Sequence, residues 1–121
     1  MGQPVVHWEF WSKEPEKLSE FYSKIFGWNI QHIPAMNYHM VQTGGVGGIN
    51  GGIMKPKEGP WPSNLTFYIE VDDVEGYTKK VAASGCKVII EKMDVPGVGT
   101  MSMFLDPDNR PIGLWKKAPG L

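Results

Sequence analysis

The chain has 121 residues, of which 41% are hydrophobic, and its 12 basic and 13 acidic side chains nearly cancel. That length suits one ordinary domain with a single core, and the absence of like-charge runs argues against a nucleic-acid or membrane-surface partner. No apolar run approaches the roughly 20 residues that span a bilayer, and no leader-like pattern opens the chain. We therefore expect a cytoplasmic protein with a small-molecule partner.

A strand is expected over residues 5–12 and a helix over residues 15–26. In the strand, the side chains of His7, Glu9 and Trp11 share one face, and apolar side chains fill the other. Pro15 suits the first position of the helix, and Gly27 ends it. The aromatic residues interpreted as core are Trp8, Phe10, Phe21, Tyr22, Phe26 and Phe67.

A very similar strand and helix recur over residues 65–84, where Asp73 can cap the helix and Gly85 can end it. The alignment places Thr66 opposite His7 in the repeat. Self-similarity of this kind indicates two copies of one supersecondary unit.

Three shorter strands are expected after each helix, over residues 28–33, 38–42 and 50–54, and then over residues 87–91, 99–105 and 111–116. The predicted fold class is α+β: one domain over residues 1–121, made of two βαβββ modules at about 4–54 and 64–117. Residues 55–63 form a turn-rich linker. The helices cover one face of each sheet, and if the two sheets curl toward each other the uncovered faces line a cup.

Side chains on the predicted cup face are candidates for ligand binding, because polar groups among aromatic ones on a concave surface are typical of small-ligand pockets. These candidates are Trp11, Thr66, Tyr68, Glu70, Met101, Met103, Gly113 and Trp115. His7 and Glu9 lie on the same face as catalytic candidates. His32 and His39 are expected to be solvated, and the glycine-rich run over residues 44–52 is expected to be a hairpin, since it lacks a phosphate-loop pattern.

Four spaced motifs carry a family resemblance: His7 on the first strand, Phe21-Tyr22 followed by Ile25-Phe26-Gly27-Trp28, Val71-Asp72-Asp73, and Asp106-Pro107-Asp108-Asn109. Together they resemble the vicinal-oxygen-chelate superfamily, which includes glyoxalase I, bleomycin-resistance proteins, fosfomycin-resistance enzymes and extradiol dioxygenases. The resemblance covers essentially the whole chain. It implies the glyoxalase/bleomycin-resistance/dioxygenase fold and a homodimer, but this fold carries many activities.

In metal-dependent members, the resemblance implies a divalent ion held by about four side chains from the first, fourth, fifth and eighth strands. His7 fills the first position, whereas the fifth-strand position falls on Thr66 and the eighth-strand position on Gly113, neither a usual ligand. The fourth strand offers no Asp, Glu, His or Cys. His7 is therefore the only family ligand retained, and no cofactor is expected. A divalent ion remains an alternative if His7 recruits Glu9, with help from Glu70.

Three functional interpretations follow. The leading one is a glyoxalase/bleomycin-resistance-like protein that binds a small organic molecule without the usual metal site. The second is a lyase, isomerase or dioxygenase-like enzyme that uses His7 and Glu9 as metal ligands or as acid and base. The third is a non-catalytic dimeric subunit. The sequence leaves the identity of the ligand open.

Overall fold

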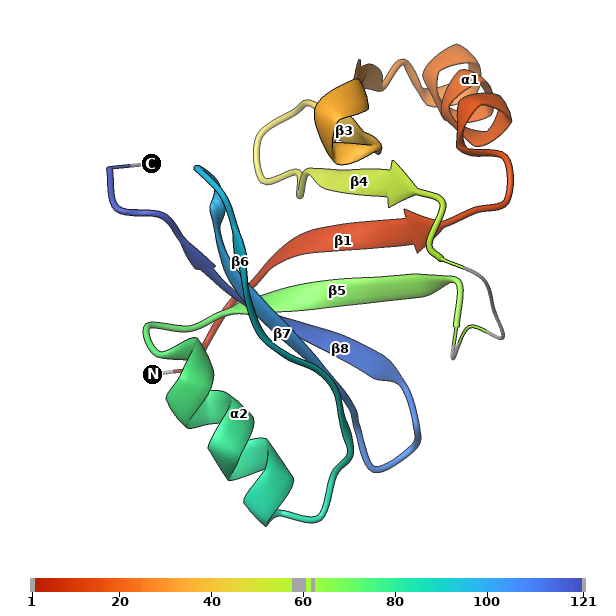
Figure 1. The fold of residues 1–121 in the computed structure, drawn as a ribbon. Coiled ribbons are helices and arrows are strands. Elements are labelled where there is room, and N and C mark those ends of the chain that lie inside the picture. Colours follow the sequence, from red (N-terminus) through yellow and green to blue (C-terminus); the bar gives the residue numbers. More distant parts are fainter. Residues whose placement is uncertain (1, 58–60, 62, 121) are drawn as a thin grey trace. The chain divides into compact units, whose positions relative to one another are not determined.

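The computed structural model describes residues 2–57, 61 and 63–120 (Figure 1). Each half has the predicted βαβββ order, which confirms the α+β fold class. The helices and strands are β1 (Val5–Trp11), α1 (Pro15–Phe26), β2 (Asn29–Ile33), the 3-10 helix η1 (Pro34–Met36), β3 (Tyr38–Gln42), β4 (Gly51–Met54), β5 (Leu65–Glu70), α2 (Val74–Ala83), β6 (Val88–Val95), β7 (Gly99–Leu105) and β8 (Pro111–Lys117).

Two elements differ from the prediction. Strand β6 continues to Val95, four residues beyond its predicted end, because register shifts on either side of Ile90 interrupt the alternation that marks a strand in sequence. The short helix η1 was not predicted. It ends at Asn37, which takes the left-handed conformation with φ of 49°.

The chain forms two compact units. The first unit is His7–Leu65, and the second unit joins the N-terminal residues up to Val6 with the chain from Thr66 onward. The predicted linker over residues 55–63 lies partly outside the described residues. None of the described helices is long and apolar enough to cross a membrane.

The sheet of the first unit has the strand order β2-β3-β4-β1. Strand β1 runs parallel to β4, and the other neighbours are antiparallel. Helix α1 contacts β4 and β2. Its Tyr22 ring stacks on Trp28 with centroids 4.8 Å apart and on Phe10 with centroids 5.4 Å apart. An aromatic cluster therefore forms the core of this unit.

The core prediction was wrong for three aromatic residues. Phe21 is 52% exposed and Phe26 is 60% exposed, because the fully buried residues of α1 are Pro15 and Ser19, and Tyr22 is the aromatic residue of the helix that stacks on Phe10. The Ser19 hydroxyl donates to the Pro15 carbonyl at 2.7 Å. Phe67 on β5 is 40% exposed.

The sheet of the second unit has the strand order β5-β8-β7-β6, with β5 parallel to β8. Helix α2 lies over β6, β7 and β8. A buried core cluster joins Val74 of α2 to Val71, which precedes the helix, and to Leu114 on β8. In the same layer the Thr78 and Ser102 hydroxyls share a buried hydrogen bond of 2.7 Å, which links α2 to β7. The other face of this sheet carries the predicted ligand-binding side chains.

Candidate functional site

One face of the first unit's sheet brings together side chains from β1 and β3. Glu9 pairs with Gly52 on β4, and Trp11 pairs with Met54, which in turn pairs with Tyr38 on β3. Directly paired residues point to the same side of a sheet. Glu9, Trp11 and Tyr38 therefore share the face opposite the aromatic core.

Hydrogen bonds join these side chains into one group, which we name the His7 network: His7, Glu9, Trp11 and Tyr38. The Tyr38 hydroxyl donates to Glu9 Oε2 at 2.7 Å, and the Trp11 indole N–H donates to Glu9 Oε1 at 2.7 Å. The Tyr38 hydroxyl also lies 2.7 Å from His7 Nε2. Glu9 is only 5% exposed, so these two donors take the place of water around its carboxyl oxygens.

The Tyr38 hydroxyl lies at the centre of the network. A tyrosine hydroxyl has a single proton, and that of Tyr38 is donated to Glu9. The His7 tautomer with its proton on Nε2 complements this arrangement, because Nε2 can then donate to the Tyr38 oxygen. Burial lowers the pKa of His7 to about 4, so the imidazole is neutral at pH 7.

Tyr38 reaches the two strand-β1 residues because Gly52 has no side chain. A Cβ atom at position 52 would overlap the Tyr38 hydroxyl and the ring carbon that bears it. Tyr38 was not among the predicted site residues, because its place depends on strand register rather than on any motif. One signal was available in the sequence. Tyr38 begins a strand, His7 and Glu9 form a His-x-Glu pattern on another strand, and the strand that lies between them in the sheet contains two glycines.

The second unit carries a comparable face opposite α2. Tyr68 pairs with Gly113, and Glu70 pairs with Trp115. On β7, Met103 pairs with Gly113 and Met101 pairs with Trp115, so both methionines lie on the same side of the sheet. The structure thus places on one face the predicted residues Thr66, Tyr68, Glu70, Met101, Met103, Gly113 and Trp115.

Several of these side chains are buried in the chain. Thr66, Tyr68, Met101 and Met103 are all less than 9% exposed. The Thr66 hydroxyl donates to the Pro111 carbonyl at 2.5 Å. Their role as ligand-binding residues stays a prediction.

Possible metal ligands are sparse on both faces. On β4, the residues that share the face of Glu9 are Gly52 and Met54. On β5 and β8, the residues that were predicted to occupy the family's ligand positions are Thr66 and Gly113, neither of which is a usual ligand. Within the part of the chain that the structure describes, no three His, Cys, Asp or Glu side chains are grouped so as to hold an ion.

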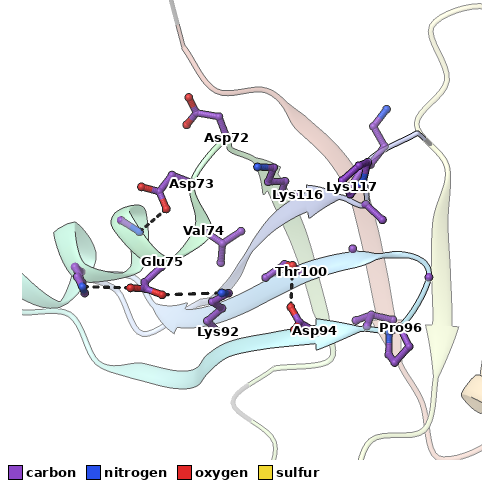
Figure 2. Close-up of a pocket in the computed structure, with 17 residues that line it drawn as sticks. Asp72, Asp73, Val74, Glu75, Lys92, Asp94, Pro96, Thr100, Lys116 and Lys117 are labelled. Carbon is purple, nitrogen blue, oxygen red and sulfur yellow. Dashed lines mark hydrogen bonds and ion pairs between the residues drawn. The ribbon is translucent and has the colours of Figure 1, made fainter.

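A groove of about 630 Å³ lies on the second unit, between the first turn of α2, the β6–β7 hairpin and the end of β8 (Figure 2). Lys79 and Lys92 both approach the carboxylate of Glu75, at 3.3 and 4.0 Å. The Thr100 hydroxyl donates to Asp94 at 3.0 Å. The groove contains none of the predicted site residues, and its charges largely compensate one another.

Comparison with known proteins identifies the family. The model of the Glyoxalase/Bleomycin resistance protein/Dioxygenase superfamily matches residues 5–113. The chain belongs to this superfamily. The match covers both units, and it confirms the resemblance seen in the motifs.

Curated relatives within this superfamily are longer than the chain. CFP32 of Mycobacterium tuberculosis, which is described as a glyoxylase, is 29% identical over 114 residues, covering 92% of this chain and 43% of CFP32. The anthracycline biosynthesis protein DnrV of Streptomyces peucetius is 39% identical over 56 residues, covering 46% of this chain and 20% of DnrV. The chain thus spans about two fifths of CFP32.

Solved structures share the fold at low identity. A superfamily member from Vibrio splendidus superposes with a TM-score of 0.68 at 18% identity, covering 96% of this chain and 100% of that one. Methylmalonyl-CoA epimerase from Mycobacterium tuberculosis gives a TM-score of 0.66 at 14% identity, covering 95% of this chain and 88% of the epimerase. At these identities the similarity shows the fold alone.

Proposed function

We propose that this chain binds a small organic molecule at the His7 network, and that binding does not require the ion of the metal-dependent members. The observation that carries the proposal is the hydrogen-bonded line from His7 through Tyr38 to the buried carboxylate of Glu9. Members of this superfamily bind small-molecule ligands.

The chemistry of the network suits a ligand with both a polar group and an apolar body. Polar side chains that are shielded from water and held in fixed positions recognise a ligand's hydroxyl or carbonyl group more strongly than solvated ones. Trp11 adds a flat aromatic surface beside them. Its indole N–H holds Glu9 and so fixes the carboxylate in place.

The donor set supports a site without a resident ion. His7 Nε2 is already hydrogen-bonded to the Tyr38 hydroxyl, and an ion at that nitrogen would displace this bond. The Thr66 hydroxyl is bonded to the Pro111 carbonyl, and Gly113 offers no donor. A four-ligand ion of the family type does not fit these residues.

The test is ligand binding by chelator-treated protein. The panel takes its compounds from the names of similar proteins: an anthracycline and methylmalonyl-CoA, each titrated by calorimetry. We expect saturable binding of at least one compound to the wild type, and loss of about tenfold or more in affinity for Tyr38→Phe. Tyr22→Phe, which keeps its stacked ring, is the matched control.

Two outcomes would overturn this proposal. One is binding that disappears on chelation and returns only with added Ni²⁺ or Zn²⁺. The other is binding that Tyr38→Phe and Glu9→Gln leave unchanged. In the second case the bound compound does not touch the network.

A second candidate function is acid–base catalysis by His7, favoured by the neutral imidazole that hydrogen-bonds to a carboxylate through Tyr38. A neutral imidazole can take up a proton from a bound substrate, and Glu9 can stabilise the resulting charge. His7→Asn should then abolish turnover of a panel compound while leaving its affinity within about threefold. Equal turnover by this variant would exclude the candidate.

A further inference from the structure

A row of paired residues leads away from the His7 network across the first unit's sheet. Glu9 on β1 pairs with Gly52 on β4. Gly52 pairs in turn with Met40 on β3, and Met40 pairs with Gln31 on β2. Paired residues point to the same side of a sheet, and neighbouring strands are about 4.8 Å apart, so the row is about 14 Å long. A ligand that touches the network can therefore lie along the row toward Gln31.

The chemistry of the row changes from one end to the other. At the network end is the buried carboxyl group of Glu9. In the middle, the Tyr38 ring fills the space above Gly52, and Met40 beside it is 41% exposed, so both side chains offer apolar surface. At the far end, the exposed Gln31 offers an amide, which donates and accepts hydrogen bonds without carrying a charge.

The four strands of this sheet provide no permanent positive charge. All four are described in full, and none of β1, β2, β3 and β4 contains a lysine or an arginine, whereas Glu9 is their one acidic residue. The lysines of this unit lie on α1 or beyond the ends of the strands. A carboxylate or phosphate on the row would lose water without gaining a cation, and it would approach the carboxyl group of Glu9. The row therefore disfavours anions.

The opposite face of the same sheet carries a pair of histidines. His32 on β2 pairs with His39 on β3, and their rings stack with centroids 4.5 Å apart. His39 pairs in turn with Ile53, the neighbour of Phe10, so this pair lies on the core side of the sheet. The prediction that both histidines are solvated was wrong for His39, which is 6% exposed, whereas His32 is exposed. His32 thus follows Gln31 in the chain but points to the other side.

We infer, on the basis of the function proposed above, that Gln31 and Met40 determine the specificity of the ligand site. They select an uncharged molecule with a flat apolar body over an anion of the same shape. The polar end of the ligand meets the His7 network, its body lies on the Tyr38 ring and on Met40, and its far end hydrogen-bonds to the Gln31 amide. An anion is rejected because no cation on the four strands compensates its charge.

The test compares two probes that differ in one charge: the carboxamide and the carboxylate of naphthalene, substituted at the same ring position. Each is titrated into the full chain by calorimetry at pH 7.5 and physiological ionic strength. We expect the wild type to bind the carboxamide about tenfold or more tightly than the carboxylate. Gln31→Lys adds a cation to the row, so it should strengthen carboxylate binding by about threefold or more.

A substitution on the other face is the matched control. His32→Lys adds the same charge one residue along the strand, on the opposite side of the sheet. It should leave both affinities unchanged, because charges act over only about 8 Å at this ionic strength. Both positions are exposed, so both variants keep the fold, which circular dichroism checks. Met40→Ser removes apolar surface from the middle of the row and should weaken both probes by about threefold.

Three outcomes would overturn the inference. They are equal affinities of the wild type for the two probes, equal effects of Gln31→Lys and His32→Lys, and no binding of either probe at millimolar concentration. Tyr38→Phe separates this failure from that of the proposed function. If it weakens binding of two equally tight probes, the network binds ligands and the selection against anions is wrong. If it leaves carboxamide binding unchanged, the probe does not touch the network, and both proposals are wrong.

Discussion

The ring of Tyr38 occupies the space that a side chain at position 52 would fill. Gly52 on β4 pairs with Glu9 on β1 and with Met40 on β3. The Tyr38 ring therefore lies over Gly52 as it extends from β3 toward the Glu9 carboxylate on β1. The second unit repeats this arrangement, since a Cβ at Gly113 would overlap the ring of Tyr68. In each unit, a glycine leaves the space that one tyrosine ring occupies.

Gly52→Ala tests this arrangement. The added methyl group collides with the ring and hydroxyl of Tyr38, so we expect a loss of about 1–3 kcal/mol in the free energy of unfolding. Urea denaturation measures it. Gly2→Ala is the control, because a Cβ there has no atom within 4 Å. A Gly52→Ala protein as stable as the wild type would contradict the packing described here.

Tyr38→Phe keeps the ring and removes the hydroxyl. His7 Nε2 and Glu9 Oε2 then each lose a hydrogen-bond partner in a shielded setting. We expect a loss of about 1–3 kcal/mol in the free energy of unfolding, larger than that of the control Tyr22→Phe. If the two variants unfold at the same urea concentration, the hydroxyl contributes little to stability.

The low pKa of His7 makes stability depend on pH. Its value of about 4 in the folded chain lies below the ordinary 6.5, so the unfolded chain takes up the proton first as the pH falls. The stabilising contribution is complete above about pH 7 and declines between pH 6.5 and 4, with a loss of about 2 kcal/mol by pH 5. His39, whose pKa is also lowered, acts in the same direction.

Urea denaturation at pH 7.5 and at pH 5.0 measures this loss. In His7→Asn the difference between the two pH values should shrink, because the buried imidazole is gone. Comparing each protein with itself removes any general destabilisation caused by the substitution. An unchanged difference would mean that His7 does not titrate in this range.

The buried hydrogen bond between Thr78 and Ser102 predicts non-additive substitutions. Ser102→Ala leaves the Thr78 hydroxyl with its bond to the Val74 carbonyl, whereas Thr78→Val leaves the buried Ser102 hydroxyl without its α2 partner. We expect Thr78→Val to cost about 1–3 kcal/mol and the double variant to cost less than the sum of the two single ones. Strict additivity in urea denaturation would contradict the pairing.

Much of the fold could be predicted from sequence, because it depends on local patterns. The helix limits are marked by Pro15 and Gly27 in the first half, and Asp73 caps α2 by accepting from the Gly76 N–H at 2.9 Å. The end of β6 could not be predicted, since irregular pairing with β7 extends it. Burial of Phe21 was predicted wrongly, because the periodicity of a helix shows an apolar stripe but not which residues of it the sheet contacts.

The candidate site was predictable only within one strand. His7, Glu9 and Trp11 share a face of β1 because alternation fixes it. Tyr38 and the His32–His39 pair could not be found in this way, since both depend on which residues stand opposite each other in neighbouring strands. The roles of His7 and Glu9, the homodimer and the cytoplasmic location stay predictions.

Strand β1 belongs partly to each compact unit: Val6 counts with the second and His7 with the first. The Glu70 N–H donates to the Pro4 carbonyl at 2.8 Å, so the start of the chain supports a strand that begins about 60 residues later. The duplicated halves are therefore not separable by cutting at the linker. A fragment that starts at residue 64 would lack the N-terminal residues that group with it. To express the second half alone, the first six residues of the chain would have to be joined to that fragment.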